Sequence, residues 1–411
     1  MTIAILGYGK EGKAVENYFK KQNKDFKIFE NFTDEELKNF NLAPYEDVFR
    51  SPGVKPYDKS WNSSTKYFFE HCPRPIIGVT GTKGKGTTCS LITAILKTLG
   101  KNVFLVGNIG NPAIEILDEI KPEDVVVYEM SSFQLWDLNA SPKYAVVLRV
   151  EPDHLNMHGT FEDYVNSKSH ITEFQTENDF CIYFKDNATS KQIAEKSKGR
   201  KLTYPIDNKS ERLSRILNSL NIPGDHNKEN AEAALLVAST YFNLSFEEFL
   251  EENEKDLIST FQTFEGLPHR CQFLRELNGV KYYDDNFSTT IPSLEVALKS
   301  FSDKNIILIL GGRDKTAGKN YPIISSMIDK NQNIAKVVLI GESGHDLFNN
   351  FHHDNFILTE SLQEAVTAAK IEAEKIPNSI VLMSPAAASF DMFKDVYDRG
   401  AQYQTLIKNL I

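Results

Sequence analysis

Short runs of apolar, β-branched residues alternate with longer helical patterns along this 411-residue chain, and this alternation constrains the fold more than any other feature. The strand-like runs are apolar at odd and even positions alike, which is typical of strands covered on both faces. Helical patterns such as TTCSLITAILKTLG, residues 87–100, lie between them. The alternation predicts an α/β protein with parallel sheets and helices on both faces. The runs expected as strands are residues 2–6, 75–81, 102–107, 124–130, 144–150, 305–312, 335–341 and 379–384.

Two changes in composition divide the chain. Residues 61–75, WNSSTKYFFEHCPRP, have the composition of a linker before a new strand. Near residues 264–273, FEGLPHRCQF, a long acidic helical stretch ends and another series of strands begins. We therefore predict three domains, over residues 1–74, 75–264 and 265–411.

Charge and cysteine content exclude several classes of function. The net charge is -10 and the pI about 5.5, which argues against nucleic acid as the main partner but leaves an anionic substrate open. The four cysteines (Cys72, Cys89, Cys181 and Cys271) form no CxxC pair, so neither a zinc site nor a disulfide framework is expected. No apolar run approaches the roughly 20 residues of a membrane span, and the N-terminus begins directly on a strand pattern. A cytoplasmic protein is the resulting prediction.

A first glycine loop, GYGKEG, follows the first expected strand. Gly7, Gly9 and Gly12 match the G-x-G-x-x-G dinucleotide fingerprint, and Glu30 ends the next strand-like run. Backbone N–H groups at the following helix start favour a phosphate or diphosphate. The motif leaves three interpretations open: an NAD site, another diphosphate such as a nucleotide sugar, and a tight turn without a ligand.

A second glycine loop, GVTGTKGKGTTCS, occupies residues 78–90. It departs twice from the phosphate-loop pattern G-x-x-x-x-G-K-[ST], with Val79 at the first glycine position and Gly86 at the position of the metal-binding hydroxyl. Its small residues still allow backbone amides to converge on phosphate oxygens, with Lys85 reaching the β- and γ-phosphates. The loop alone favours phosphate binding over a plain strand-to-helix turn only modestly.

Acidic and imidazole side chains follow two neighbouring strand patterns. VVVYEMSSFQL places Glu129 at one strand end, and VVLRVEPDHLNMHG places Asp153 and His154 after another. The carboxyl ends of parallel strands gather at one edge, where a phosphate loop also lies. Because Mg²⁺ takes oxygen ligands together with substrate phosphates, Glu129 fits a magnesium site well, and His154 is an even choice between ligand and structural residue.

Several of these stretches, in this order, resemble the Mur ligase family of ATP-dependent enzymes that build cell-wall peptides. They are GVTGTKGKGTT, YEMSSFQL, RVEPDHLNMHGTFEDYVNSK, HNKENAEAAL and LPHRCQF, and with the C-terminal stretches YYDDNFSTT and LMSPAAASFDMFKDVYDRG the resemblance spans nearly the whole chain. The C-terminal stretches narrow it to the member that adds D-glutamate. The resemblance implies an N-terminal Rossmann-like domain that binds the UDP substrate. It also implies a central P-loop ATP domain and a C-terminal Rossmann-like domain that contacts ATP and the amino acid.

The resemblance also assigns residues to roles. It implies catalytic roles for Lys85, Lys168, His154 and Glu129, the last two as Mg²⁺ ligands together with a carbamylated Lys168. It implies ATP contacts from Gly81, Thr82, Lys83, Gly84, Lys85, Gly86, Thr87, Thr88, Asn227, Asn230, His269, Arg270 and Asp285. It implies contacts to the UDP substrate from Gly7, Gly9, Gly12, Ser51, Gly53 and Asn108.

The acceptor site implied by the resemblance is less complete. Thr289, Lys315, Ser389 and Phe390 match positions that bind D-glutamate, since an ammonium and hydroxyls can hold a carboxylate. The D-glutamate member often has a lysine in the stretch that reads DDNFSTT here, and this chain has Phe287 at that position. One cationic partner for the acceptor is therefore missing.

The implied reaction is amide ligation through an acyl phosphate, with ATP and Mg²⁺, between UDP-N-acetylmuramoyl-L-alanine and D-glutamate. We expect a monomer with no nucleic-acid partner. The alternatives are a Mur-type ligase for another amino acid, a folate-type ligase and, more distantly, an NAD-dependent oxidoreductase based on GYGKEG alone. At Gly86, either Thr87 or water replaces the usual hydroxyl ligand. We favour water, because the next helical position points about 100° away.

Overall fold

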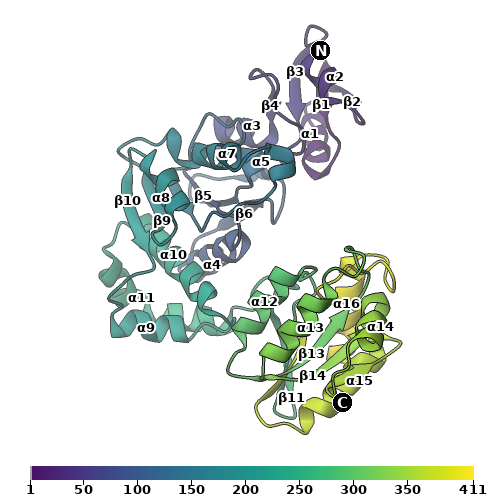
Figure 1. The fold of residues 1–411 in the computed structure, drawn as a ribbon. Coiled ribbons are helices and arrows are strands. Elements are labelled where there is room, and N and C mark those ends of the chain that lie inside the picture. The colour runs from purple at the N-terminus through teal and green to yellow at the C-terminus, as the bar shows by residue number, and fades with distance from the viewer. Residues whose placement is uncertain (1) are drawn as a thin grey trace. The chain divides into compact units, whose positions relative to one another are not determined.

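The structure is a computed structural model that describes residues 2–411, and its contacts divide the chain into two compact units (Figure 1). Unit 1 reaches Ser219 and includes His226–Gln262, and unit 2 comprises Leu220–Asp225 and Thr263–Ile411. Each unit is described by itself below. No helix within residues 2–411 is both long and apolar enough to cross a membrane.

Unit 1 contains two parallel sheets. The first has the order β2-β1-β3-β4 and the second has the order β10-β9-β8-β5-β7-β6. The first sheet and its helices are β1 (Thr2–Leu6), α1 (Lys10–Lys20), β2 (Asp25–Phe29), α2 (Asp34–Lys38), β3 (Tyr45–Arg50), β4 (Asn62–Ser63) and α3 (Ser64–His71). The strands of the second sheet are β5 (Ile76–Thr80), β6 (Val103–Gly107), β7 (Val125–Glu129), β8 (Tyr144–Val147), β9 (Phe180–Phe184) and β10 (Arg200–Tyr204). The helices that follow are α4 (Lys85–Thr98), η1 (Ala113–Glu119), α5 (Ser132–Leu135), α6 (Leu155–His158), α7 (Phe161–Glu173), α8 (Ala188–Glu195), α9 (Glu211–Asn218), α10 (Asp225–Tyr241) and α11 (Phe246–Thr263).

Strand β1 shows how the two-residue period of a strand builds the core of unit 1. Ile3 and Ile5 point to one face and pack in a cluster that continues into the second sheet through residues such as Val126 and Tyr128. Ala4 and Leu6 point to the other face and pack in a separate cluster with Trp61. The two sheets of unit 1 therefore share one continuous apolar core.

Unit 2 contains one sheet of order β11-β12-β16-β13-β14-β15. Its strands are β11 (Gln272–Leu277), β12 (Val280–Asp284), β13 (Asn305–Gly311), β14 (Ile334–Ile340), β15 (Phe356–Leu358) and β16 (Ser379–Met383). Its helices are α12 (Ile291–Ser300), α13 (Tyr321–Lys330), α14 (Gly341–Asn350), α15 (Leu362–Glu374) and α16 (Val396–Lys408).

Both faces of this sheet are covered by helices, as alternation along β13 requires. Ile306, Leu308 and Leu310 pack in a cluster with side chains of α12, α13 and α14. Ile307 and Ile309 pack in another cluster with side chains of α15 and α16. The predicted α/β fold with parallel-rich sheets is confirmed.

The structure adds to the sequence interpretation in two places. Residues 61–75 are largely ordered: β4 pairs with β3, and α3 begins after Ser63, whose side chain caps the helix by accepting from the Lys66 amide. Strand β11 was not among the runs expected as strands, and it pairs antiparallel with β12. Asn278 and Gly279, both with positive φ, form the two-residue turn between these strands, and such Asn-Gly turns make tight hairpins.

Candidate active site

The loop between β5 and α4 has the backbone geometry of a phosphate loop. Gly84 immediately precedes α4 and adopts a left-handed conformation, with φ of 87°. A Cβ atom at Gly84 would lie 2.7 Å from Oδ1 of Asn230, and one at Gly81 would lie 2.6 Å from Cβ of Leu148. Both positions therefore require glycine. The first turn of α4 then leaves its backbone N–H groups available to an anion.

Two lysines meet at this loop. Nζ of Lys85, the first residue of α4, donates to the carbonyl oxygens of Gly81 (3.1 Å) and Thr82 (3.0 Å). Nζ of Lys168, on α7, donates to the same Gly81 oxygen at 2.9 Å and to Oγ1 of Thr80 at 3.3 Å. The structure thus brings together two residues that lie more than 80 positions apart in the sequence.

Lys168 is almost completely buried, at 1% exposure. Burial, reinforced by the nearby charge of Lys85, holds the pKa of its ammonium well below the ordinary value, while Asp153 and Glu129 act in the opposite direction. A lowered pKa increases the share of the neutral amine, which is the nucleophilic form.

Glu129 is buried at the end of β7, and its two carboxylate oxygens differ in their hydrogen bonding. Oε1 accepts from Nδ2 of Asn108 at 3.0 Å. Oε2 is buried and has no hydrogen-bond partner within residues 2–411. A buried carboxylate oxygen without a donor is costly, and a cation would satisfy it. This oxygen fits the donor set of a magnesium site.

His154 lies in a different setting. It adopts a left-handed conformation before α6, its side chain is half-exposed, and its Nε2 is 3.6 Å from Oδ2 of Asp153. Within residues 2–411, no group of three or more His, Cys, Asp and Glu side chains is close enough together to hold a metal. His154 as a metal ligand therefore stays a prediction.

Other predicted ATP-binding residues stabilise the loop itself. Thr82 Oγ1 accepts from the Glu151 amide at 2.9 Å. Thr88 is buried and donates to Oδ1 of Asn230 at 3.3 Å, and Nδ2 of Asn230 donates to Oδ1 of Asn227. The contact between Thr88 and Asn230 attaches α4 to α10. The remaining predicted loop residues are Lys83, which is exposed, and Gly86 and Thr87, which are partly exposed.

The first glycine loop is closely packed at two of its three glycines. Gly7 has φ of 83°, and a Cβ at Gly12 would lie 2.3 Å from the Gly7 carbonyl oxygen. Ser51 Oγ donates to that same oxygen at 2.6 Å. At Gly9 and Gly53 nothing lies within 4 Å of a Cβ position, so there is open space beside the backbone. Space at the middle glycine is what a diphosphate needs to approach the chain.

Polar contacts that the sequence did not predict join the two sheets of unit 1. Arg50, 2% exposed, pairs with Asp137, and Nε lies 3.2 Å from Oδ2; Lys66 Nζ pairs with the same carboxylate at 2.8 Å. Burial raises the pKa of the Asp137 carboxyl, whereas Arg50 and Lys66 lower it. The net result is a lowered pKa. Gln134 Nε2 donates to Oε1 of Glu11, inside the first glycine loop, at 2.6 Å.

His158 is a second histidine that the sequence interpretation left unused. It is buried, stacks on Phe133 and packs on Trp136, and its Nε2 lies 3.0 Å from Oγ of Ser132. Burial, with the charges of Lys168 and His154, lowers its pKa to about 4. The four-residue spacing between His154 and His158 could have indicated that the two histidines lie near each other, because residues four apart along a helix are neighbours.

The predicted ATP-binding residues of unit 2 lie at one edge of its sheet, where Asp285 follows β12 and His269 and Arg270 precede the antiparallel β11. Asp285 follows β12, is buried, and accepts from the Cys271 amide (3.1 Å) and from Ser384 Oγ (2.8 Å). Burial raises its pKa to about 6. His269 Nδ1 lies 2.7 Å from Oδ2 of Asp284, and the Arg270 guanidinium lies over the ring of Phe287.

The predicted acceptor residues come from the same edge. Thr289, Lys315 and Ser389 follow β12, β13 and β16, which run parallel to one another. Lys315 is exposed and Phe390 is 67% exposed, whereas Ser389 is buried.

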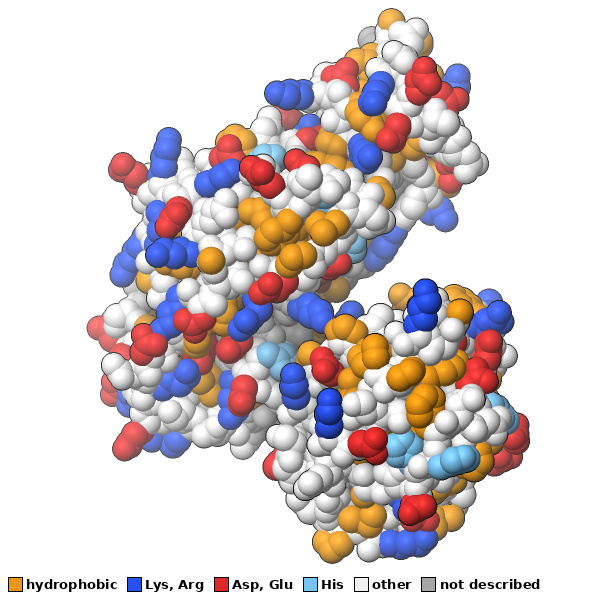
Figure 2. Space-filling model, viewed as in Figure 1, with side chains coloured by type: hydrophobic (Ala, Val, Ile, Leu, Met, Phe, Trp, Pro, Cys, Tyr) orange, Lys and Arg blue, Asp and Glu red, His pale blue; other side chains and the backbone are white. Residues whose placement is uncertain are grey.

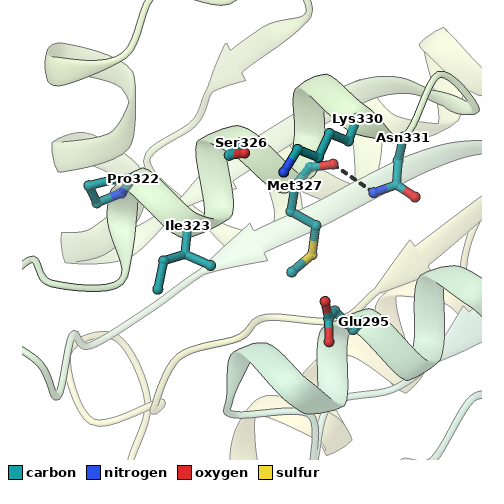
Figure 3. Close-up of a pocket in the computed structure, with 7 residues that line it drawn as sticks. All are labelled: Glu295, Pro322, Ile323, Ser326, Met327, Lys330 and Asn331. Atoms are coloured by element: carbon teal, nitrogen blue, oxygen red, sulfur yellow. Dashed lines mark hydrogen bonds between the residues drawn. The ribbon is translucent and has the colours of Figure 1, made fainter.

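A cavity of about 390 Å³ lies elsewhere in unit 2, between α12 and α13. Figure 3 shows Met327 directed toward Glu295 inside it, and Figure 2 shows hydrophobic side chains on the face of unit 2 that carries these helices. None of the predicted site residues lines this cavity, so it is separate from the candidate site.

Comparisons with known proteins agree with these observations. Residues 79–238 match the Mur ligase middle domain, and residues 269–387 match the Mur ligase glutamate ligase domain. A UDP-N-acetylmuramoylalanine--D-glutamate ligase of Clostridium tetani is 31% identical over 427 residues, covering 96% of this chain and 88% of the relative. The enzyme of the same name from Clostridium novyi is 30% identical, covering 95% and 88%.

Solved structures share the fold at low sequence identity. A MurF structure from Acinetobacter baumannii aligns with a TM-score of 0.62 at 16% identity, covering 92% of this chain and 89% of that one. MurF from Thermotoga maritima, in complex with ADP, aligns with a TM-score of 0.60 at 16% identity, covering 99% and 95%. The predicted resemblance is confirmed, and the chain belongs to the Mur ligase family.

Proposed function

We propose that this protein is an ATP-dependent ligase of peptidoglycan precursor synthesis that joins D-glutamate to UDP-N-acetylmuramoyl-L-alanine and releases ADP and phosphate. The observation that carries the proposal is the meeting of Lys85 and Lys168 on the Gly81 carbonyl, within a loop whose glycines are sterically required. The Clostridium relatives, matched over nearly the whole chain, support the choice of substrates.

In the proposed first step, the carboxylate of the UDP substrate attacks the γ-phosphorus of ATP, forming an acyl phosphate and ADP. The amine of D-glutamate then attacks the acyl carbon, and phosphate leaves from the tetrahedral intermediate. Positioning and charge neutralisation dominate phosphoryl transfer. Lys85 supplies a positive charge beside the loop amides, where the β- and γ-phosphates would lie.

Lys168 in this proposal is carbamylated. Its neutral amine adds to CO₂, and the carbamate forms with loss of one proton. The modification replaces a buried positive charge beside Lys85 with a negative one, so that repulsion between the two residues becomes attraction. Glu129 through Oε2, His154 and the carbamate would hold Mg²⁺, which would neutralise charge on the phosphates. Water at Gly86 completes this proposed metal site.

The remaining roles follow the same proposal. Contacts to the UDP substrate come from Gly7, Gly9, Gly12, Ser51, Gly53 and Asn108. Contacts to ATP come from residues 81–88 together with Asn227, Asn230, His269, Arg270 and Asp285, and contacts to D-glutamate come from Thr289, Lys315, Ser389 and Phe390. We also propose three domains, over residues 1–74, 75–264 and 265–411, and a monomer. A cytoplasmic location fits its nucleotide substrates and its four free thiols.

Phosphate release measured with UDP-N-acetylmuramoyl-L-alanine, ATP and a panel of amino acids tests the function. Release with D-glutamate alone is the expected result. Release with another amino acid would favour the alternative of a Mur ligase with a different acceptor. Absence of release, with a change in nicotinamide absorbance instead, would favour the distant oxidoreductase alternative.

A further inference from the structure

Lys315 is the one cation that the sequence predicted for the acceptor side of unit 2. D-Glutamate has an α-carboxylate and a side-chain carboxylate, and Lys315 can pair with only one of them. Phe287 lies two residues before Thr289 but is apolar and cannot pair with a carboxylate. Its ring packs against His269 (4.9 Å between centroids) and Tyr397 (5.4 Å). A cation elsewhere on this edge could pair with the second carboxylate.

Arg313 lies on this edge and is attached to the segment that carries Ser389. Its amide donates to the Ala388 carbonyl at 2.8 Å, and the Ala388 amide donates back at 3.1 Å. Gly312 makes this approach possible, because a Cβ there would lie 2.2 Å from the Ala388 oxygen. The backbone therefore fixes Arg313 opposite the residue before Ser389.

Ser389 is a donor that lacks an acceptor. Its side chain is 1% exposed, and its Oγ has no hydrogen-bond partner within residues 2–411. Native structures seldom leave a buried hydroxyl unsatisfied, because the lost hydrogen bond costs about 1–3 kcal/mol. A carboxylate oxygen is an acceptor that would satisfy it.

The Arg313 guanidinium pairs with Glu342, and the closest atoms are Nε and Oε2 at 3.2 Å. The backbone of Glu342 is fixed in turn, since its amide donates to Oδ2 of Asp391 at 2.9 Å. The Arg313 side chain is 57% exposed, so a ligand can reach it. The two Nη atoms carry further N–H donors, and the planar guanidinium matches the two oxygens of a carboxylate.

We propose that Arg313 binds the side-chain carboxylate of the acceptor amino acid, with the hydroxyl of Ser389 as a second donor and Glu342 orienting the guanidinium. This makes Arg313 a specificity-determining residue for the acceptor. The inference rests on the proposed function, because it requires an acidic amino acid as substrate.

Steady-state kinetics of the full chain test it. Phosphate release is measured for wild type and Arg313→Gln with D-glutamate and with D-glutamine, at saturating ATP and UDP-N-acetylmuramoyl-L-alanine. D-Glutamine differs from D-glutamate only in the side-chain carboxylate. We expect KM for D-glutamate to rise roughly 10- to 100-fold in Arg313→Gln, and the preference for D-glutamate over D-glutamine in kcat/KM to fall by a similar factor. KM for ATP should change less than about twofold.

Two further variants separate binding from structural support. Arg313→Lys retains the positive charge but lacks the planar guanidinium, so its KM for D-glutamate should be intermediate. The double variant Arg313→Glu with Glu342→Arg restores the ion pair but moves the cation, so it should remain as defective as Arg313→Gln. Lys304→Gln is the matched control, because Lys304 is part-exposed, pairs with Asp303 and precedes the opposite end of β13; its KM values should equal those of wild type.

The outcomes distinguish the two proposals. A wild-type KM for D-glutamate in Arg313→Gln, or full restoration by the charge exchange, would overturn the role of Arg313 and leave the proposed function intact. A wild-type protein that does not use D-glutamate at all would overturn the proposed function and this inference with it.

Discussion

Lys85 and Lys168 donate hydrogen bonds to a single carbonyl oxygen, that of Gly81, at 3.1 and 2.9 Å. Two ammonium groups beside one oxygen repel each other, and burial of Lys168 makes its own charge the less favourable of the two. The arrangement agrees with the roles proposed above, in which Lys85 would bind phosphates and Lys168 would be modified.

The first prediction concerns Lys85. Lys85→Ala should lower the rate of ADP release by at least roughly 10²–10³-fold, because a charge that stabilises the transition state is lost. Its melting temperature should stay close to that of wild type. Lys97→Ala is the control, since Lys97 is exposed near the other end of the same helix. Activity near the wild-type level in Lys85→Ala would refute the phosphate-loop assignment.

The second prediction concerns Lys168. Lys168→Ala should be inactive, and short carboxylates such as formate or acetate should restore part of the activity by occupying the position of the carbamate. Chloride at equal ionic strength should restore none. Measured rates that are normal without any additive would contradict the carbamate role.

The third prediction concerns the loop backbone. Gly84→Ala should destabilise the protein by more than the roughly 1–3 kcal/mol of a strained left-handed residue, because its Cβ also meets Asn230. Gly100→Ala provides the comparison: Gly100 has φ of 79°, but nothing lies within 4 Å of its Cβ position. Adding Asn230→Ala should recover part of the loss in Gly84→Ala and none in Gly100→Ala. Denaturant midpoints measure all four variants.

The fourth prediction is a pH dependence at Asp285. Its pKa is raised to about 6 in the folded protein, so the folded state binds this proton more tightly than the unfolded chain, where an aspartate titrates near 4. Its contribution to stability is therefore present below about pH 4 and is lost as pH rises through about 6.

Asp285→Asn removes this titration. Relative to wild type, the variant should gain stability between pH 4 and pH 6.5, by at most about 3 kcal/mol for a shift near two units. Urea unfolding at both pH values measures the difference. A difference between the two proteins that does not change with pH would contradict the assignment of that proton to Asp285.

The sequence predicted those parts of the fold that depend on local residue patterns. Strands such as β13 have apolar residues at consecutive positions, here 306–310, because both faces are covered, and that pattern is visible in the sequence alone. The glycine loops were equally visible, since left-handed and crowded backbone positions require glycine. The Asn278–Gly279 turn carried a readable signal for the antiparallel β11, and the sequence interpretation did not use it.

Contacts between distant residues were beyond such reasoning. Arg50 and Asp137 lie 87 positions apart, and nothing in either local stretch indicates that they are partners. In the sequence alone, Lys168 would be interpreted as an ordinary helix residue, because its burial depends on how α7 packs over β5. Only the resemblance to a family assigned it a role. The open oxygen of Glu129 and the open hydroxyl of Ser389 likewise exist only once their neighbours are placed.

The apolar cluster that runs from Ile3 and Ile5 into Val126 and Tyr128 has a consequence for protein engineering. The N-terminal sheet cannot be exchanged independently of the second sheet. A graft from another ligase would have to carry matching side chains on the second sheet as well as partners for Arg50 and Glu11. Chimeras cut near residue 74 should therefore be destabilised in both sheets at once, and their unfolding should show one transition for the two sheets.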